Sequence, residues 1–302
     1  MNTNKKPNFL IVGAMKSATT SLYMYLKEHP DIYLPSIKEP MFFNNINSEN
    51  KQSILKGRAK KKITSFKKYY DLFKNVNNEI AIGEASPGYL YNSNCAKLIH
   101  KYLGSDTKII VVLRHPVNRA YSNFLHAKRS GKEEIKEFIH AINNEAERIE
   151  KNWSPLYHYI NQGFYYAQLK KYYKIFPKKN IKVILFNELT RNKNNCLKEI
   201  CLFLNVNENF NFSNEKKTNV SGLPNGVLGW FVMKLRYYSL LPNIVYSKIF
   251  PSSFISFIYK IIYKKPKKLN EQLINDLTNK YYKNDILKLE NLISKDLTHW
   301  LK

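Results

Sequence analysis

A lysine followed by a row of hydroxyl residues is the first set of side chains in this sequence that is suited to chemistry. The set comprises one ammonium group and four hydroxyl groups: Lys16, Ser17, Thr19, Thr20 and Ser21. The ammonium group offers a full positive charge, and each hydroxyl offers a hydrogen-bond donor. This combination is suited to binding a phosphate or sulfate group.

These side chains lie between a predicted strand and a predicted helix. Residues 9–12 are apolar without alternation, which predicts a strand buried on both faces of a parallel sheet, and Gly13 ends it. Residues 19–27 have apolar side chains at helical spacing, and Ser17 is the predicted N-cap. A tight turn into a helix aims free N–H groups and the positive end of the dipole at one anion. The alternative is an ordinary strand–turn–helix with a surface lysine and capping hydroxyls.

The spacing in this turn excludes the Walker A motif of nucleotide-binding proteins. That motif has a glycine, four further residues and then Gly-Lys-Ser/Thr, whereas Lys16 follows Gly13 by only three positions. The turn resembles the 5′-phosphosulfate loop, Lys-x-Gly-Thr-Thr/Ser, of sulfotransferases that use 3′-phosphoadenylyl sulfate (PAPS). Ala18 stands where that family usually has glycine; we expect it to fit at negative φ and to crowd the phosphate at positive φ. The resemblance implies PAPS contacts for these residues: Lys16, Ser17, Ala18, Thr19, Thr20 and Ser21.

A second anion site is predicted after residues 108–113, an apolar strand that ends in Arg114. An arginine at the carboxyl end of a parallel strand points into the crevice where such sheets bind ligands. Pro116 is typical of the first turn of a helix, and Ser122 on that helix adds a hydroxyl that suits a phosphate monoester. The 3′-phosphate motif of the sulfotransferases has this form, which implies PAPS contacts for Arg114 and Ser122. His126 aligns with a histidine implicated in the N-sulfotransferases and is a candidate catalytic residue, although a lone helical histidine also suits packing.

A charged pair, Lys38 and Glu39, comes directly before an aromatic run. Glu39 is a candidate general base held near apolar walls, and the alternative is a surface ion pair that contributes little. In the glycan-modifying sulfotransferases a Lys-Glu-x-x-Phe-Phe element carries the catalytic base, and Lys38, Glu39, Phe42 and Phe43 match it. The resemblance implies catalytic roles for Lys38 and Glu39, and we expect a substrate contact from Phe42.

Two further segments resemble family elements less completely. Residues 84–89 resemble Glu-Lys-Ser-Pro-x-Tyr, but Ala85 replaces the lysine, so any substrate contact of that lysine is absent. Glu84 either binds acceptor hydroxyls or caps the next helix. Residues 216–224 stand where the family has a basic loop that closes over the nucleotide, although the Lys-Gly-Arg of the heparan enzymes is missing. Without the resemblance this stretch would be a linker; with it, cofactor contacts are implied for Lys217, Ser221 and Gly222.

The composition is that of a strongly basic folded protein. The 302 residues carry a formal net charge of +26, and 44% are hydrophobic, which excludes a disordered chain and favours an anionic partner. A solvated, lysine-rich surface would also account for the charge. Nucleic acid is not an expected partner, because the sequence has no recognisable reader motif. Cys95, Cys196 and Cys201 are too few and wrongly spaced for a disulfide framework or a zinc site, so we expect no metal.

No targeting or membrane-spanning segment is predicted. The first seven residues are polar and lead into a strand, which is unlike a signal peptide, and no apolar run is long enough to span a bilayer. We therefore expect a cytoplasmic protein. Residues 237–263 are apolar but interrupted, and residues 264–268 are basic, so the segment 237–268 either rests on an anionic membrane or packs against its own domain.

Together these features predict an α/β protein with three layers and a central parallel sheet, a P-loop nucleotide-kinase-like sulfotransferase fold. We expect one domain over residues 1–302, with a helical segment from about 227 to 302 packed on it. The resemblance implies PAPS-dependent transfer of a sulfuryl group to a hydroxyl or amine of a carbohydrate or glycan acceptor, with PAP as the second product. Two alternatives stay open: a kinase-like nucleotide enzyme on the same sheet, and a basic, non-enzymatic binder of membranes or nucleic acid.

Overall fold

The computed structural model describes most of the chain, with gaps near the N-terminus and in the C-terminal third. The described residues are 6–46, 63–213, 223–226, 229, 231, 263–264 and 266–302.

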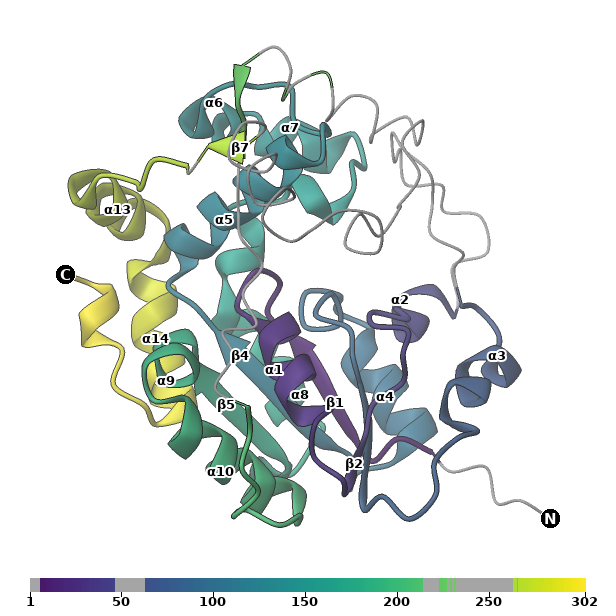
Figure 1. The fold of residues 1–302 in the computed structure, drawn as a ribbon. Helices are drawn as coiled ribbons and strands as arrows, with labels where there is room; N and C mark the ends of the chain where they lie inside the picture. The colour runs from purple at the N-terminus through teal and green to yellow at the C-terminus, as the bar shows by residue number, and fades with distance from the viewer. Residues whose placement is uncertain are drawn as a thin grey trace.

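A five-stranded parallel sheet lies at the centre of the molecule (Figure 1). Its strands are β1 (Phe9–Gly13), β2 (Ile32–Tyr33), β3 (Ala81–Ala85), β4 (Lys108–Leu113) and β5 (Ile181–Leu185). Their order in the sheet is β2-β3-β1-β4-β5, and every neighbouring pair is parallel. The chain therefore leaves β1 toward one side, returns through β3, and continues on the other side with β4. This reversal creates a switch point at the carboxyl ends of β1, β3 and β4, which is where open parallel sheets bind ligands.

The side chains of the central strands alternate between two hydrophobic cores. Leu10 and Val12 of β1 face one core, and Phe9 and Ile11 face the other. All four are fully buried, because the sheet is covered on both faces, and this explains why the sequence shows an unbroken apolar run instead of alternation.

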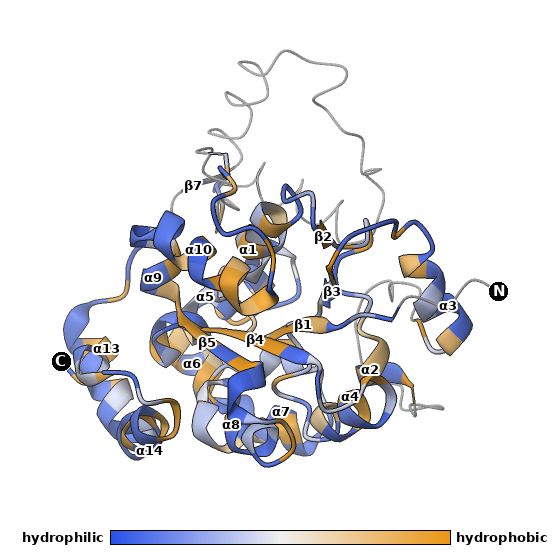
Figure 2. Cartoon of the chain, turned by 90° about the horizontal axis from the view of Figure 1, so that it is seen from below, coloured by the Kyte–Doolittle hydropathy of each residue, from blue (hydrophilic) through white to orange (hydrophobic). Residues whose placement is uncertain are grey.

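Helices cover both faces of the sheet and complete three layers (Figure 2). The core of one face contains residues of α1 (Thr19–Leu26), α9 (Phe186–Arg191) and α10 (Lys193–Leu204). The core of the other face contains residues of α4 (Cys95–Leu103), α5 (Pro116–Arg129), α8 (Tyr165–Tyr173) and α14 (Lys283–Ile293). The prediction of a three-layer α/β fold with a central parallel sheet is confirmed.

The remaining elements are short. The α-helices and strands among them are α2 (Phe42–Asn45), α3 (Phe66–Tyr70), α6 (Phe138–Asn143), α7 (Glu145–Glu150), the antiparallel pair β6 (Leu223–Pro224) and β7 (Tyr263–Lys264), and α13 (Glu271–Leu277). Single 3-10 turns lie at Asp71–Phe73, Pro155–Tyr157, Asn161–Gly163, Lys178–Asn180 and Thr298–Trp300. A π-helical turn, Thr278–Tyr282, joins α13 to α14. Leu277, Tyr282, Ile286 and Leu289 of this C-terminal segment pack into the same core as α5 and α8.

The segment 237–268, for which membrane contact was one of two predictions, lies almost wholly outside the described residues. Within the described ranges, no helix is both long enough and apolar enough to cross a bilayer.

Candidate active site

The two predicted anion sites lie side by side at the carboxyl edge of the sheet. Arg114 follows the last residue of β4, and its Nη1 donates a hydrogen bond to the Lys16 carbonyl oxygen at 3.3 Å. The Tyr165 hydroxyl donates to the Arg114 carbonyl oxygen at 2.9 Å, and the Arg114 guanidinium carbon lies 4.7 Å from the centre of the Phe186 ring. The guanidinium group is therefore fixed between the loop after β1 and the first residue of α9.

Lys16 lies in a partly buried and strongly cationic environment. Burial lowers the pKa of the Lys16 ammonium to about 8, and the nearby charges of Arg129, Arg114 and Lys38 act in the same direction. Glu39 is the acidic neighbour that opposes them. Because several positive charges face one carboxylate in the part of the chain that the structure describes, this environment is complementary to an anion.

The loop after β1 has an unusual backbone. Lys16 and Ala18 both have left-handed conformations, with φ of 68° and 65°. Ala18, not Ser17, is the N-cap of α1, and it offers no side-chain cap, so the predicted capping role of Ser17 is wrong. The sequence left open whether Ala18 has a negative or a positive φ. The observed φ is positive, which glycine adopts readily and alanine adopts only with strain.

The turn before α1 contains a buried hydroxyl group and leads into a helix N-terminus without a side-chain cap. The Ser17 side chain is fully buried, and its Oγ has no hydrogen-bond partner among the described residues. Because α1 begins without a side-chain cap, its first N–H groups lack the partner that such a cap normally supplies. Thr19 is buried in this turn, and Thr20 and Ser21 are half-buried. A buried hydroxyl without a partner is costly in a protein core, which indicates a ligand at this turn.

The loop before α2 brings a carboxylate to the same place. Glu39 is paired with Lys38, and their side chains are 39% and 18% exposed. The Glu39 N–H donates to the Ala85 carbonyl oxygen at 3.1 Å, which ties this loop to the end of β3. The Glu39 side chain is partly exposed and ion-paired, whereas the sequence predicted a carboxyl group held near apolar walls.

Two residues predicted to contact the acceptor lie in the interior instead. Phe42 is fully buried and stacks on Tyr69, with ring centres 4.3 Å apart. Glu84 is also fully buried. We correct both assignments: Phe42 anchors α2 in the core, and Glu84 is not accessible to an acceptor hydroxyl and is not a helix cap.

Helix α5 carries a histidine and an arginine toward Lys16. Burial, together with the charges of Lys16 and Arg129, lowers the pKa of His126 to about 4, so the imidazole is neutral at neutral pH. Arg129 Nη2 lies 3.3 Å from His126 Nδ1. Sequence reasoning missed Arg129, although its position one helical turn after His126 is a signal that it shares that face. Ser122 is half-buried one turn before His126 on the same helix.

The comparison with protein families identifies the chain. A model of the sulfotransferase domain matches residues 6–226, which include the loops after β1, β3 and β4. The chain belongs to the sulfotransferase family. This assignment agrees with the resemblance of residues 16–20, 38–43 and 108–122 to sulfotransferase motifs.

Solved structures and curated proteins place this sulfotransferase among known relatives. A crystal structure of a sulfotransferase from Alicyclobacillus acidocaldarius is 29% identical and covers 99% of this chain and 100% of its own, with a TM-score of 0.72. The membrane-associated sulfotransferase kil1 of Dictyostelium discoideum is 34% identical over 48% of this chain and 29% of its own length. Heparan sulfate glucosamine 3-O-sulfotransferase 3B1 of Mus musculus is 30% identical over 57% of this chain and 39% of its own. The chain thus spans less than half the length of these two curated relatives.

Three of the predicted cofactor contacts cannot be placed in this sulfotransferase. Lys217, Ser221 and Gly222 lie outside the described residues. Among the residues that are described, no group of three or more His, Cys, Asp or Glu side chains is arranged to hold a metal ion.

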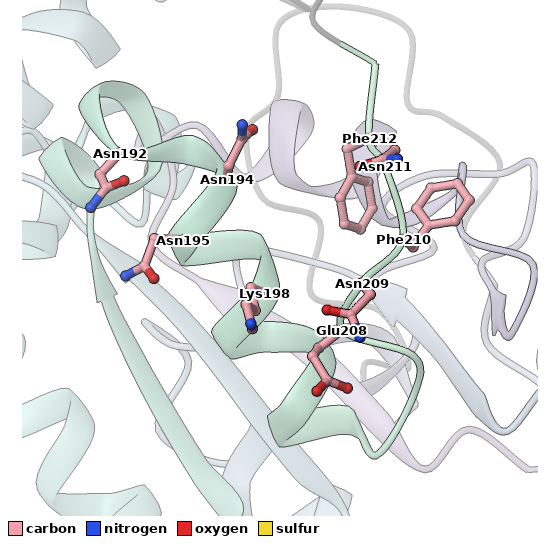
Figure 3. A pocket seen from close by; sticks show the side chains of 9 residues that line it. All are labelled: Asn192, Asn194, Asn195, Lys198, Glu208, Asn209, Phe210, Asn211 and Phe212. Carbon is pink, nitrogen blue, oxygen red and sulfur yellow. The ribbon is translucent and has the colours of Figure 1, made fainter.

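A separate surface pocket of about 620 Å³ lies at the start of α10 and the segment after it (Figure 3). It is lined by amides, two charged side chains and two phenyl rings: Asn192, Asn194, Asn195, Lys198, Glu208, Asn209, Phe210, Asn211 and Phe212. None of these residues belongs to the loops that carry Lys16, Glu39 or Arg114, so the pocket is distinct from the candidate active site.

Proposed function

We propose that this sulfotransferase takes a sulfuryl group from PAPS and transfers it to a hydroxyl or amine of a carbohydrate acceptor. The proposal rests on the contact between the two predicted anion sites. Arg114, which follows β4, donates a hydrogen bond to the carbonyl oxygen of Lys16 in the loop after β1. A donor with a 5′-phosphosulfate and a 3′-phosphate requires two neighbouring anion sites, and two adjacent cationic side chains at this sheet edge support that assignment.

Apart from Ala18, whose methyl group stands at the positive φ at which we expected it to crowd the phosphate, the residues present fit this nucleotide. Burial lowers the pKa of Lys16, and among the described residues Arg129, Arg114 and Lys38 act in the same direction while Glu39 opposes them, so an anion would relieve the repulsion between the cations. The Ser17 hydroxyl is buried and has no hydrogen-bond partner within the described ranges, and α1 begins without a side-chain cap. An oxyanion bound at the N-terminus of α1 would offset the excess positive charge and accept hydrogen bonds from the Ser17 hydroxyl and from the helix N–H groups.

Each side chain has a defined task in the proposed reaction. Lys16 and the first turn of α1 hold the phosphosulfate end, and Arg114 with Ser122 holds the 3′-phosphate. PAPS supplies an activated sulfuryl group and a leaving group on which negative charge increases. The Lys16 ammonium is already in place to stabilise that charge, so no reorganisation is needed during the reaction.

Glu39 accepts the proton of the acceptor in this scheme. Its side chain is 39% exposed, which leaves room for an acceptor to approach, and its ion pair with Lys38 restricts the position of the carboxylate. His126 is neutral because of burial and the neighbouring cations. It is therefore able to accept or donate a hydrogen bond beside Lys16 without adding a further charge.

The proposed acceptor class rests on the relatives. One relative acts, by its name, on a glucosamine of heparan sulfate, and further matches are heparan sulfate N-sulfotransferases that are 25% identical over 70% of this chain. The net charge of +26 is complementary to an acidic glycan.

A thermal-shift experiment with PAP and ATP, each with and without Mg²⁺, tests the nucleotide assignment. PAP at about 100 times its Kd should stabilise the fold by about 2.7 kcal/mol, which raises the Tm by about 5 °C in a domain of this size. ATP should shift the Tm less, and Mg²⁺ should not be required for PAP. A larger shift with Mg²⁺ and ATP than with PAP would support the kinase-like alternative and refute the proposal.

A further inference from the structure

A buried carboxyl group lies directly beneath the loop that carries Glu39. Glu84 is the next-to-last residue of β3 and its side chain is fully buried. The hydroxyl groups of Tyr89, Ser86 and Tyr69 lie close enough to stabilise its charge. None of them makes a hydrogen bond of ordinary length and angle with either carboxylate oxygen in this conformation. The proposed roles of Lys16, Arg114 and Glu39 make no use of this carboxyl group.

Two of these three hydroxyl groups also hold the loop before and within α2. The Met41 N–H donates to Ser86 Oγ at 3.0 Å, and the Phe43 N–H donates to the Tyr89 hydroxyl at 3.3 Å. A hydroxyl group has one proton, and an oxygen that accepts from an amide directs its own proton elsewhere. For Ser86 and Tyr89 the carboxylate of Glu84 is a nearby acceptor, and the two hydroxyl groups also lie close to each other.

The loop needs such anchors because its backbone is strained. Glu39 and Met41 have positive φ angles of 60° and 54°, which cost about 1 kcal/mol each for residues other than glycine. Three anchors on the loop come from the segment after Glu84. They are the Ala85 carbonyl oxygen, which accepts from Glu39, and the two hydroxyl oxygens that accept from Met41 and Phe43.

We propose that Glu84 is a positioning residue that orients the Ser86 and Tyr89 hydroxyls and, through them, holds the Glu39 loop in its working conformation. The functional part of this inference rests on the proposed role of Glu39 as the general base. The structural part, which is the anchoring of the loop, does not depend on that role.

The charge of Glu84 is sensitive to pH near neutrality. Burial raises its pKa to about 7, the three hydroxyls lower it, and the charge of Glu39 raises it. Among the described residues, Cys95 of α4 and Tyr172 of α8 are further titratable groups that face it. Above about pH 7 the side chain is a carboxylate, and in this proposal it draws the hydroxyl hydrogens of Ser86 and Tyr89 toward itself as a hydrogen-bond acceptor. Below that pH it carries a proton of its own, and the anchoring should weaken.

Four variants test the proposal. Glu84→Gln, Ser86→Ala and Tyr89→Phe each change one link between β3 and the loop. Tyr172→Phe is the matched control, because it removes a buried hydroxyl of the same cluster that donates to the Tyr89 carbonyl oxygen instead of holding the loop. The measurements are kcat with saturating PAPS, the Kd for PAP, and amide hydrogen exchange at Met41 and Phe43.

We expect the three loop variants to lower kcat by about 10-fold or more, since small displacements of a catalytic group are costly. Their Kd for PAP should change less than twofold, and exchange at Met41 and Phe43 should accelerate. Tyr172→Phe should leave all three measurements within about twofold of the wild type. The wild-type rate should also decline below about pH 7, and Glu84→Gln should lack that decline because glutamine does not titrate.

Unchanged hydrogen exchange and kcat in Glu84→Gln would overturn the proposal, as would an equal loss of PAP affinity and kcat. If Glu84→Gln does not fold, Ser86→Ala and Tyr89→Phe decide the question by the same measurements. A different result would show that the proposed function is wrong while the anchoring of the loop by Glu84 is right. If Glu39→Gln retains wild-type turnover, the base role of Glu39 is wrong, while faster amide exchange in Glu84→Gln still supports the anchoring.

Discussion

Replacing Glu84 by glutamine should change the pH dependence of folding stability. Glu84 is fully buried, and its pKa is raised from 4.5 to about 7 in the folded protein, chiefly by burial. Between these two values the folded state binds the proton more tightly than the unfolded state. Stability is therefore lost as the pH rises through this window, and the full cost above it is about 3 kcal/mol.

The pH range that is convenient to study captures most of this cost. From about pH 5.5 to about pH 8, the carboxyl group should lower the free energy of unfolding of the wild type by about 2 kcal/mol. Glutamine has nearly the same shape and no titration. The free energy of unfolding of Glu84→Gln minus that of the wild type should consequently rise by about 2 kcal/mol from about pH 5.5 to about pH 8. This rise is expected whether the variant is more or less stable than the wild type at about pH 5.5.

Urea unfolding of both proteins at several pH values, with matched m values, measures this difference. Glu147→Gln is the control, because Glu147 is 58% exposed in a surface ion pair with Lys151 and its pKa is lowered, so it is ionised throughout the range. Parallel stability curves for Glu84→Gln and the wild type would refute the reasoning. They would mean that Glu84 keeps an ordinary pKa and that its surrounding hydroxyls compensate fully for burial.

Three further predictions concern the loop after β1. Lys16→Ala should lower turnover with saturating PAPS by about 10²-fold, which is the effect of removing a preorganised donor. Wild-type turnover in Lys16→Ala would exclude the proposed role, and Lys101→Ala on α4 serves as the control. The affinity for PAP should decrease as the pH rises above about 8, because an anion binds the protonated form of Lys16 more tightly; calorimetry should find this dependence absent in Lys16→Arg. Ala18→Gly should raise the free energy of unfolding by about 0.5 kcal/mol, because glycine adopts the positive φ at this position without strain. As a control, Ala127→Gly inside α5 should lower the free energy of unfolding by about 1 kcal/mol. Thermal unfolding in which both substitutions change the stability in the same direction would contradict this account.

The central elements could be predicted because their signals are local. The apolar runs before Gly13 and Arg114 predicted two buried parallel strands, and the structure has β1 and β4 there. Pro116 was placed correctly at the first turn of α5. In each case the backbone conformation depends on residues within one short segment, so composition and spacing are sufficient.

The N-cap of α1 shows where local reasoning failed. Ser17 was the chemically favoured cap, but the chain places Ala18 there in a left-handed conformation and buries the Ser17 hydroxyl. A tight turn between a central strand and its helix is constrained by packing against the whole sheet, and this constraint outweighs the preference of a single side chain.

The sequence by itself determined the family motifs, the strand–turn–helix order and the candidate residues Lys16, Glu39 and Arg114. Only the tertiary structure decided which of the candidates meet. In the folded protein Arg129, at the far end of α5, lies near Lys16, and the side chains of Phe42 and Glu84 are fully buried. The physical reason is that burial and charge proximity arise between segments distant in the chain, and the pKa of a buried carboxyl depends on neighbours that no local pattern identifies.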